Sequence, residues 1–94
     1  MKYHSVVGYG ILGKGIFEAL SKNDKKIKVF NRSQKKLSKV SSSRKFKNIE
    51  ELFENSKIIF FILKDYNSIN YFLKNIKNIE NLENKTYVNL STIT

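Results

Sequence analysis

The chain has 94 residues, a formal net charge of +10, and neither cysteine nor proline. This length allows one domain with a small core. Without cysteine the sequence excludes disulfides and thiolate metal ligands, which fits a reducing compartment, so we expect a cytoplasmic protein.

The excess of positive charge does not by itself predict a nucleic-acid interface. Lysines are spread along the chain from Lys2 to Lys85, with no arginine cluster and no recognition-helix pattern. We therefore expect no specific nucleic-acid partner, although the positive field should help to attract an anionic ligand. The longest apolar run, residues 58–63, is too short to cross a bilayer, and no signal peptide is apparent, so we expect no membrane partner.

The first part of the chain reads as a strand, a helix and a second strand. Residues 3–7 and 27–30 are rich in β-branched and aromatic side chains, as strands are. The segment 12–21 between them has helical periodicity, which predicts an apolar stripe. The stripe consists of Leu12, Ile16, Ala19 and Leu20.

The middle of the chain is more polar and predicts shorter elements. Ser33 is a suitable N-cap for a helix reaching about Val40, followed by a serine-rich loop at residues 41–43. Residues 45–47 predict a short third strand. Asn48 then caps a brief helix whose inward face carries Ile49, Leu52 and Phe53.

The second half repeats the strand–helix–strand pattern. Residues 57–63 are almost continuously apolar, which predicts a strand covered on both faces. Asp65 and Ser68 are expected to open a helix, and residues 86–90 form the last predicted strand. The inward positions of that helix are Ile69, Phe72, Leu73 and Ile76.

Strands that alternate with helices predict an α/β fold with a doubly wound, parallel sheet of the Rossmann type. We expect residues 1–94 to form a single domain, truncated after about the fifth strand, with strand order 3-2-1-4-5. In such a sheet the ligand crevice lies outside the carboxyl ends of the strands where the order reverses, here the first and fourth.

Residues 8–13 spell G-x-G-x-x-G between the first strand and the first helix. Gly8 would allow the tight turn, Gly10 the approach of a pyrophosphate, and Gly13 close packing of the helix on the sheet. Tyr9, Ile11 and Leu12 complete this block, and the free N–H groups at the helix start favour an anion. An ordinary strand–turn–helix connection is the alternative, but the position of the block favours dinucleotide binding.

The end of the second strand indicates which dinucleotide is preferred. A site for NAD places Asp or Glu there, about 20 residues after the glycines, to bind the ribose 2′-hydroxyl. This chain has Asn31, Arg32 and Ser33 instead, with Lys36 close behind. Arg32 could lie against the adenine and pair with a 2′-phosphate, so the pattern favours NADP(H). The alternative is that these residues form only a solvated turn and a helix cap.

No residue of the chain stands out as a catalyst or a metal ligand. His4, the single histidine, lies early in the first strand, away from the predicted crevice. Glu50 and Glu51 are expected on a solvated helix face. Four aromatic residues are interpreted as core; they are Phe60, Phe61, Tyr71 and Phe72.

Four blocks in the same order along the chain match a known family: residues 8–13, 29–33, 62–66 and 88–92. The sequence resembles the N-terminal NADP-binding domain of the β-hydroxyacid dehydrogenases, which include 6-phosphogluconate and 3-hydroxyisobutyrate dehydrogenases. It is most similar to the imine reductase branch. The resemblance extends over essentially the whole chain.

The resemblance implies roles for the last two blocks. Leu63, Lys64 and Asp65 would contact the adenosine and ribose side of the cofactor, and Asn89 would also lie at the cofactor. Ser91 and Thr92 would lie beside the nicotinamide and the substrate. Leu12 departs from the family, which commonly has Met there, and residues 91–94 lack the glycine and proline that often follow.

The resemblance also implies that the catalytic residue belongs to a helical second domain that this sequence lacks. We expect the cofactor-binding part of an oxidoreductase that transfers a hydride between NADPH and a carbonyl, hydroxy-acid or imine substrate. The chain would then bind NADP(H) without turnover, and a small-molecule substrate would require the missing domain. A standalone, non-catalytic NADP-binding or regulatory module is the alternative.

Overall fold

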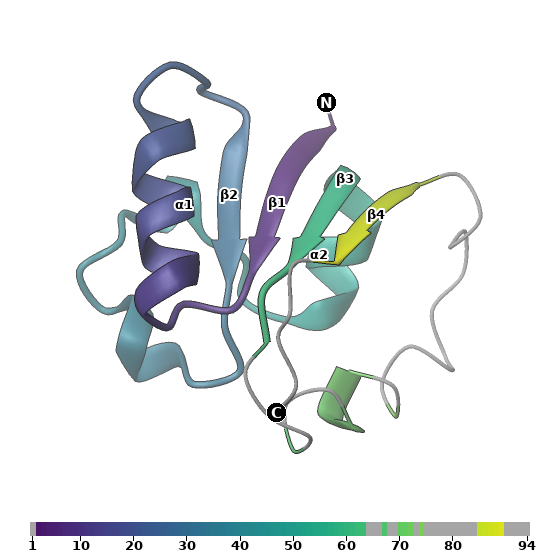
Figure 1. Ribbon diagram of the computed structural model, residues 1–94. Helices are drawn as coiled ribbons and strands as arrows, with labels where there is room; N and C mark the ends of the chain where they lie inside the picture. The colour runs from purple at the N-terminus through teal and green to yellow at the C-terminus, as the bar shows by residue number, and fades with distance from the viewer. Residues whose placement is uncertain (1, 64–66, 68–69, 73, 75–84, 90–94) are drawn as a thin grey trace.

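The computed structural model describes residues 2–63, 67, 70–72, 74 and 85–89 (Figure 1). Its centre is a parallel sheet of four strands in the order β2-β1-β3-β4. The strands are β1 (Tyr3–Val7), β2 (Ile27–Phe30), β3 (Ser56–Phe61) and β4 (Thr86–Asn89). The predicted Rossmann-type α/β class is confirmed.

The strand predicted at residues 45–47 is reduced to a single parallel bridge between Val29 and Lys45. The N–H of Phe46 donates to the carbonyl of Val29 at 3.0 Å, which extends the pairing by one bond only. The pairing stops because Asn48 already caps the next helix. The bridge lies beside β2, so the predicted order of the five segments is confirmed even though the third is not a full strand.

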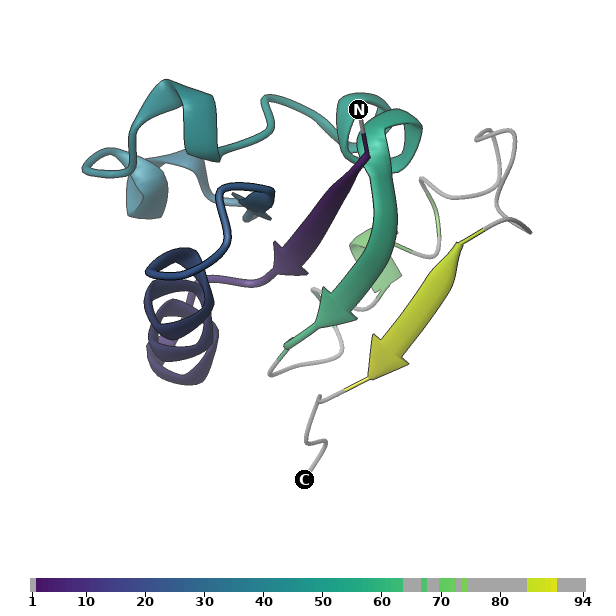
Figure 2. The same cartoon turned by 90° about the horizontal axis from the view of Figure 1, so that it is seen from above.

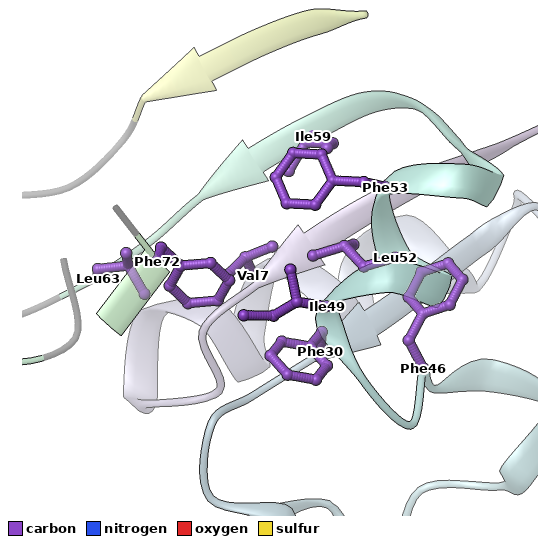
Figure 3. Close-up of a cluster of buried hydrophobic side chains, with 9 residues drawn as sticks. All are labelled: Val7, Phe30, Phe46, Ile49, Leu52, Phe53, Ile59, Leu63 and Phe72. Carbon is purple, nitrogen blue, oxygen red and sulfur yellow. The ribbon is translucent and has the colours of Figure 1, made fainter. Parts of the chain in front are cut away.

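Helices cover the two faces of the sheet, α1 (Ile11–Ser21) on one and α2 (Ile49–Asn55) on the other (Figure 2). Successive residues of β1 point to opposite faces, so Val6 packs with Phe17 of α1 while Val7 packs with Leu52 of α2. The larger of these two core clusters is aromatic-rich and lies on the α2 side (Figure 3). Asn48 caps α2 as predicted, accepting the N–H of Glu51 at 2.8 Å.

The apolar stripe predicted for α1 is largely wrong. Gly13 and Phe17 are the buried residues of this helix, and Ile16 packs partly against the core. Leu12 and Leu20 are exposed, as is Ala19. The reason is that Gly13, which has no side chain, brings the helix backbone against the turn at Gly8 and rotates the buried face by one residue.

The helix predicted from Ser33 to Val40 is also wrong. The chain forms a short 3₁₀ helix, η1 (Gln34–Leu37), and a second, η2 (Ser42–Arg44), where a loop was expected. Ser33 precedes η1 without a capping hydrogen bond from its side chain. Leu37 is the one buried residue of η1, and a single apolar anchor cannot hold a longer amphipathic helix on the sheet.

The second half forms the predicted elements as far as the structure describes it, but β3 is not buried on both faces as expected. Ile58 and Phe60, which share one face, are only half-buried, and Phe60 is in neither of the two core clusters, so its assignment to the core is wrong. β3 ends at Phe61, and Ile62 and Leu63 continue as buried, non-strand residues. Residues 70–72 are helical and Phe72 is buried as expected. Six predicted positions lie outside the described residues: Asp65, Ser68, Ile69, Leu73, Ile76 and Leu90. Within the described part, no helix has the length and hydropathy of a membrane span.

Candidate dinucleotide site

The carboxyl ends of the four strands meet at one edge of the sheet. Val7, the last residue of β1, is in register with Phe30 of β2 on one side and Phe61 of β3 on the other. Phe61 is in turn in register with Asn89, the last residue of β4. The chain leaves β1 toward β2 and later returns to its other side as β3, so the order reverses beside β1. This is where open α/β sheets bind ligands.

Gly8 makes the turn out of β1 and has a φ of +108°, which residues with a side chain rarely adopt. A Cβ at this position would lie 2.1 Å from the carbonyl oxygen of Ile62. The N–H of Gly8 donates to the carbonyl of Phe30 at 2.8 Å. The turn is therefore held between the last residue of β2 and the segment that follows β3, with no space for a side chain.

Gly13 brings the start of α1 onto this turn. A Cβ on Gly13 would lie 2.1 Å from the carbonyl oxygen of Gly8, whereas a Cβ on Gly15 would meet nothing within 4 Å. The first and third glycines of the motif are thus sterically required, and the neighbouring Gly15 is not. Gly10 is the N-cap of α1 and provides no side-chain cap.

The start of α1 presents backbone N–H groups. The first bond into the helix runs from the N–H of Lys14 to the carbonyl of Gly10 at 2.8 Å. The N–H groups of Ile11, Leu12 and Gly13 make no hydrogen bond within the described part of the chain. No acidic residue occupies the first turn. Such a helix start, with its positive dipole end, is suited to a phosphate.

The side chain of Asn31 ties the glycine turn to the end of β2. Its Oδ1 accepts the N–H of Tyr9 at 3.0 Å, and its Nδ2 donates to the carbonyl of Ser33 at 2.9 Å. The Tyr9 N–H is therefore occupied within the protein. The Tyr9 ring packs edge-on against Phe17, and burial followed by the charge of Glu18 raises the pKa of its phenol.

Arg32 is exposed and lies over the Tyr71 ring, with Cζ 5.7 Å from the ring centroid. Its Nη1 also donates a long hydrogen bond of 3.4 Å to the carbonyl of Asn67. A guanidinium has five N–H donors, so most of them remain for a ligand. Ser33 and Lys36 are exposed on the same segment. Neither ion pair found among the described residues involves Arg32 or Lys36.

The remaining predicted site residues are placed less directly. Leu63 belongs to the buried core and packs against the glycine turn. Its Cδ2 lies 3.6 Å from the position that a Cβ on Gly8 would occupy. Asn89 is exposed at the end of β4. Ile11 is 87% exposed and Leu12 51%, which places two apolar side chains at the start of α1. Lys64, Asp65, Ser91 and Thr92 lie outside the described residues.

His4 lies at the opposite, amino edge of the sheet, as expected. It is in register with the first residue of β2, Ile27, and its Nδ1 is 2.9 Å from Oδ2 of Asp24. Glu50 is exposed, as predicted, while Glu51 is half-buried. No cluster of potential metal-ligating side chains occurs in the part of the chain that the structure describes.

The sequence pattern does not predict two residues that lie beside Arg32. Next to apolar Phe72 in a helical pattern, Tyr71 reads as a core residue, and nothing in the pattern singles out Asn67. Tyr71 does pack against the core, but it also contacts Arg32. Only the tertiary fold brings Asn67 and Tyr71, which follow β3 in the chain, to the end of β2.

The fold and the glycine turn define a dinucleotide-binding domain of the Rossmann class. Residues 4–94 match the family described as the NAD binding domain of 6-phosphogluconate dehydrogenase, and the chain belongs to this family. No curated protein matches the chain. The predicted family is thereby confirmed.

Two reductases of known structure share the fold of this chain. The chain is similar to the reductive aminase from Aspergillus terreus in complex with NADPH and ethyl levulinate, with a TM-score of 0.80 and 20% identity; the match covers 98% of this chain and 32% of that one. It is also similar to an imine reductase from Pseudomonas sp., with a TM-score of 0.78, 23% identity and coverage of 99% and 33%. The chain thus spans about a third of the length of these proteins.

Proposed function

We propose that the site binds NADP(H) in preference to NAD(H). The observation that carries this proposal is the end of β2, where exposed Arg32 and Lys36 occupy the region that holds a carboxylate in NAD-selective sites. A carboxylate there would repel a 2′-phosphate, whereas a guanidinium can pair with it through two parallel N–H bonds. The NADPH bound in the reductive aminase structure agrees with this preference.

The pyrophosphate would lie at the start of α1, on the N–H groups of Ile11, Leu12 and Gly13. Gly8 and Gly13 allow the turn and the start of α1 to pack closely, Gly10 carries no side chain at the N-cap, and the dipole of α1 adds favourable charge. We assign Asn31 a supporting role, because its amide holds the glycine turn against the segment that carries Arg32. Lys64, Asp65 and Asn89 are proposed as further cofactor contacts on the resemblance.

We further propose that the domain belongs to an oxidoreductase that reduces or forms a carbonyl, hydroxy-acid or imine carbon. The cofactor would supply or accept the hydride, while this chain holds and orients it. The described residues place no histidine, aspartate or glutamate at the carboxyl ends of the strands, and the chain spans about a third of the length of its structural relatives. The proton donor and most of the substrate contacts would therefore come from a helical domain, with Ser91 and Thr92 on the substrate side.

Paired calorimetric titrations of the chain with NADPH and NADH test the cofactor assignment. We expect tighter binding of NADPH, and a loss of about 2 kcal/mol in Arg32→Ala, the usual worth of a charge-assisted hydrogen bond. Lys25→Ala is the matched control, because it removes the same charge from the exposed turn before β2, at the opposite edge. Equal affinity for both cofactors, or an equal loss in both variants, would contradict the assignment.

A turnover assay tests whether the catalytic group lies outside this chain. The 94-residue chain is expected to bind NADPH without oxidising it when a simple ketone or cyclic imine is added. Steady oxidation that depends on the substrate would show that the catalytic group is already present.

A further inference from the structure

Tyr71 occupies a position from which it can control Arg32. The Arg32 guanidinium lies over its ring at 5.7 Å, within the distance at which a cation is attracted to an aromatic face. The second contact of Arg32 is the long bond to the carbonyl of Asn67, four residues earlier in the same region. An exposed arginine otherwise loses substantial side-chain freedom when a ligand fixes it.

The placement of Tyr71 is itself held by the core. Its ring is perpendicular to that of Phe72 at 5.5 Å, and Phe72 is buried. Phe72 packs edge-on against Phe30, the last residue of β2, and against Phe61, the last residue of β3, with both centroids at 5.9 Å. The aromatic contacts thus fix Tyr71 relative to the strand that leads directly into Arg32.

We propose that Tyr71 is a positioning residue for cofactor selection: it holds Arg32 beside the end of β2, ready for the 2′-phosphate of NADPH. This inference rests on the proposed NADP(H) preference. The side chain pays part of its ordering cost before the ligand arrives, so the phosphate-bearing cofactor gains more than NADH does. Tyr71 acts through Arg32 and need not touch the phosphate.

The test compares NADPH and NADH affinities, measured by calorimetry, for the unmodified chain and for Tyr71→Leu, Tyr71→Met and Tyr71→Phe. We expect Leu and Met to weaken NADPH binding roughly three- to tenfold and NADH binding less than about twofold. Phe keeps the aromatic face and should preserve the preference. Two non-aromatic replacements are included so that poor folding of one does not decide the result.

Tyr3→Leu is the matched control. Tyr3 is also partly buried, lies edge-on to a phenylalanine, and has a cation, Lys28 Nζ, 4.8 Å from its centroid, but it lies at the amino edge of the sheet. This variant should leave the ratio of the two affinities unchanged. A double-mutant cycle provides a second readout, because Tyr71→Leu should have no further effect on the ratio once Arg32 is alanine.

The outcomes separate this inference from the proposed function. If the unmodified chain prefers NADPH and Tyr71→Leu keeps that ratio, or lowers both affinities equally, the positioning role is overturned and the proposed preference stands. If Tyr71→Leu lowers the ratio of NADPH affinity to NADH affinity as much in the Arg32→Ala variant as in the unmodified chain, Tyr71 does not act through Arg32. If the unmodified chain binds neither cofactor, both proposals fall.

Discussion

The side-chain oxygen of Asn31 accepts the backbone N–H of Tyr9 at 3.0 Å, which links the end of β2 to the glycine turn after β1. The same side chain donates to the carbonyl of Ser33. One amide therefore orders both parts of the proposed site, the turn for the pyrophosphate and the segment for the 2′-phosphate.

Asn31→Ala should weaken both the fold and the site. The Tyr9 N–H and the Ser33 carbonyl both lose their partner, so we expect a loss of about 1 kcal/mol in the free energy of unfolding, measured with urea. Affinity for NADPH and NADH should fall together, since the glycine turn serves both. Asn31→Asp keeps the acceptor for Tyr9 and adds a negative charge, so it should retain the turn but reduce the preference for NADPH. A variant Asn31→Ala with unchanged stability would show that the bond contributes nothing.

Replacement of Gly8 or Gly13 by alanine should disrupt the turn between β1 and α1. Gly8→Ala requires a residue with a Cβ to keep a φ of +108° and brings that Cβ to 2.1 Å from the Ile62 carbonyl. Gly13→Ala brings a Cβ to the same distance from the Gly8 carbonyl. Because these are backbone atoms, the turn must move, and we expect each change to cost at least about 2 kcal/mol and to abolish dinucleotide binding.

Gly15→Ala is the matched control for both variants, because the space around it is open. It lies inside α1 and is exposed, so alanine should stabilise the chain by up to about 1 kcal/mol through helix propensity and leave binding unchanged. A similar loss of stability in all three variants, measured by urea unfolding, would contradict the steric explanation.

The buried serine pair formed by Ser5 of β1 and Ser56 of β3 should behave as a unit. Ser56 Oγ donates to the carbonyl of Leu52 and bonds with Ser5 Oγ, and both serines are fully buried. Ser56→Ala should cost about 1–3 kcal/mol because it leaves the Ser5 hydroxyl without this partner. In the double variant Ser5→Ala/Ser56→Ala the cost should be smaller than the sum of the single changes. Additive losses in a urea-unfolding cycle would mean that the two hydroxyls are independent.

The pair at the amino edge predicts a pH dependence of stability. The N–H of Lys26 and then the His4 side chain donate to Asp24, and these bonds lower the pKa of its carboxyl. A lowered carboxyl pKa stabilises the folded state above the unfolded value, near pH 4, and that contribution is lost as the pH falls through the folded value. The stability difference between the unmodified chain and Asp24→Asn should therefore be constant at neutral pH and shrink below about pH 4. A difference that is independent of pH down to pH 3 would refute this.

The pKa of Lys85 is set by a tertiary contact that the sequence does not predict. Burial, and then the charge of Lys2, lowers the pKa of Lys85, whose Nζ donates to the carbonyl of Ser56 at 2.9 Å. Nothing in the sequence pattern around Lys85 predicts this contact, because Lys85 directly precedes β4 whereas Ser56 begins β3, 29 residues earlier in the chain.

The sequence by itself determined the fold class, the strand order and the glycine turn. The apolar runs of β1 and β3 have the local pattern of parallel strands, and the G-x-G-x-x-G spacing at residues 8–13 marks the turn between β1 and α1. The position of Asn31 and Arg32 beside the glycine turn could also be predicted, because both follow β2 and the carboxyl ends of parallel strands share one edge.

Only the tertiary structure decided which face of α1 is buried, how short η1 is, and that Tyr71 lies beside Arg32. Each of these depends on packing between elements: Gly13 against the turn at Gly8, the lone Leu37 anchor against the sheet, and the rings of Phe72 against Phe30 and Phe61. Periodicity describes one segment at a time, whereas packing compares the surfaces of several, so the sequence pattern could not show these contacts.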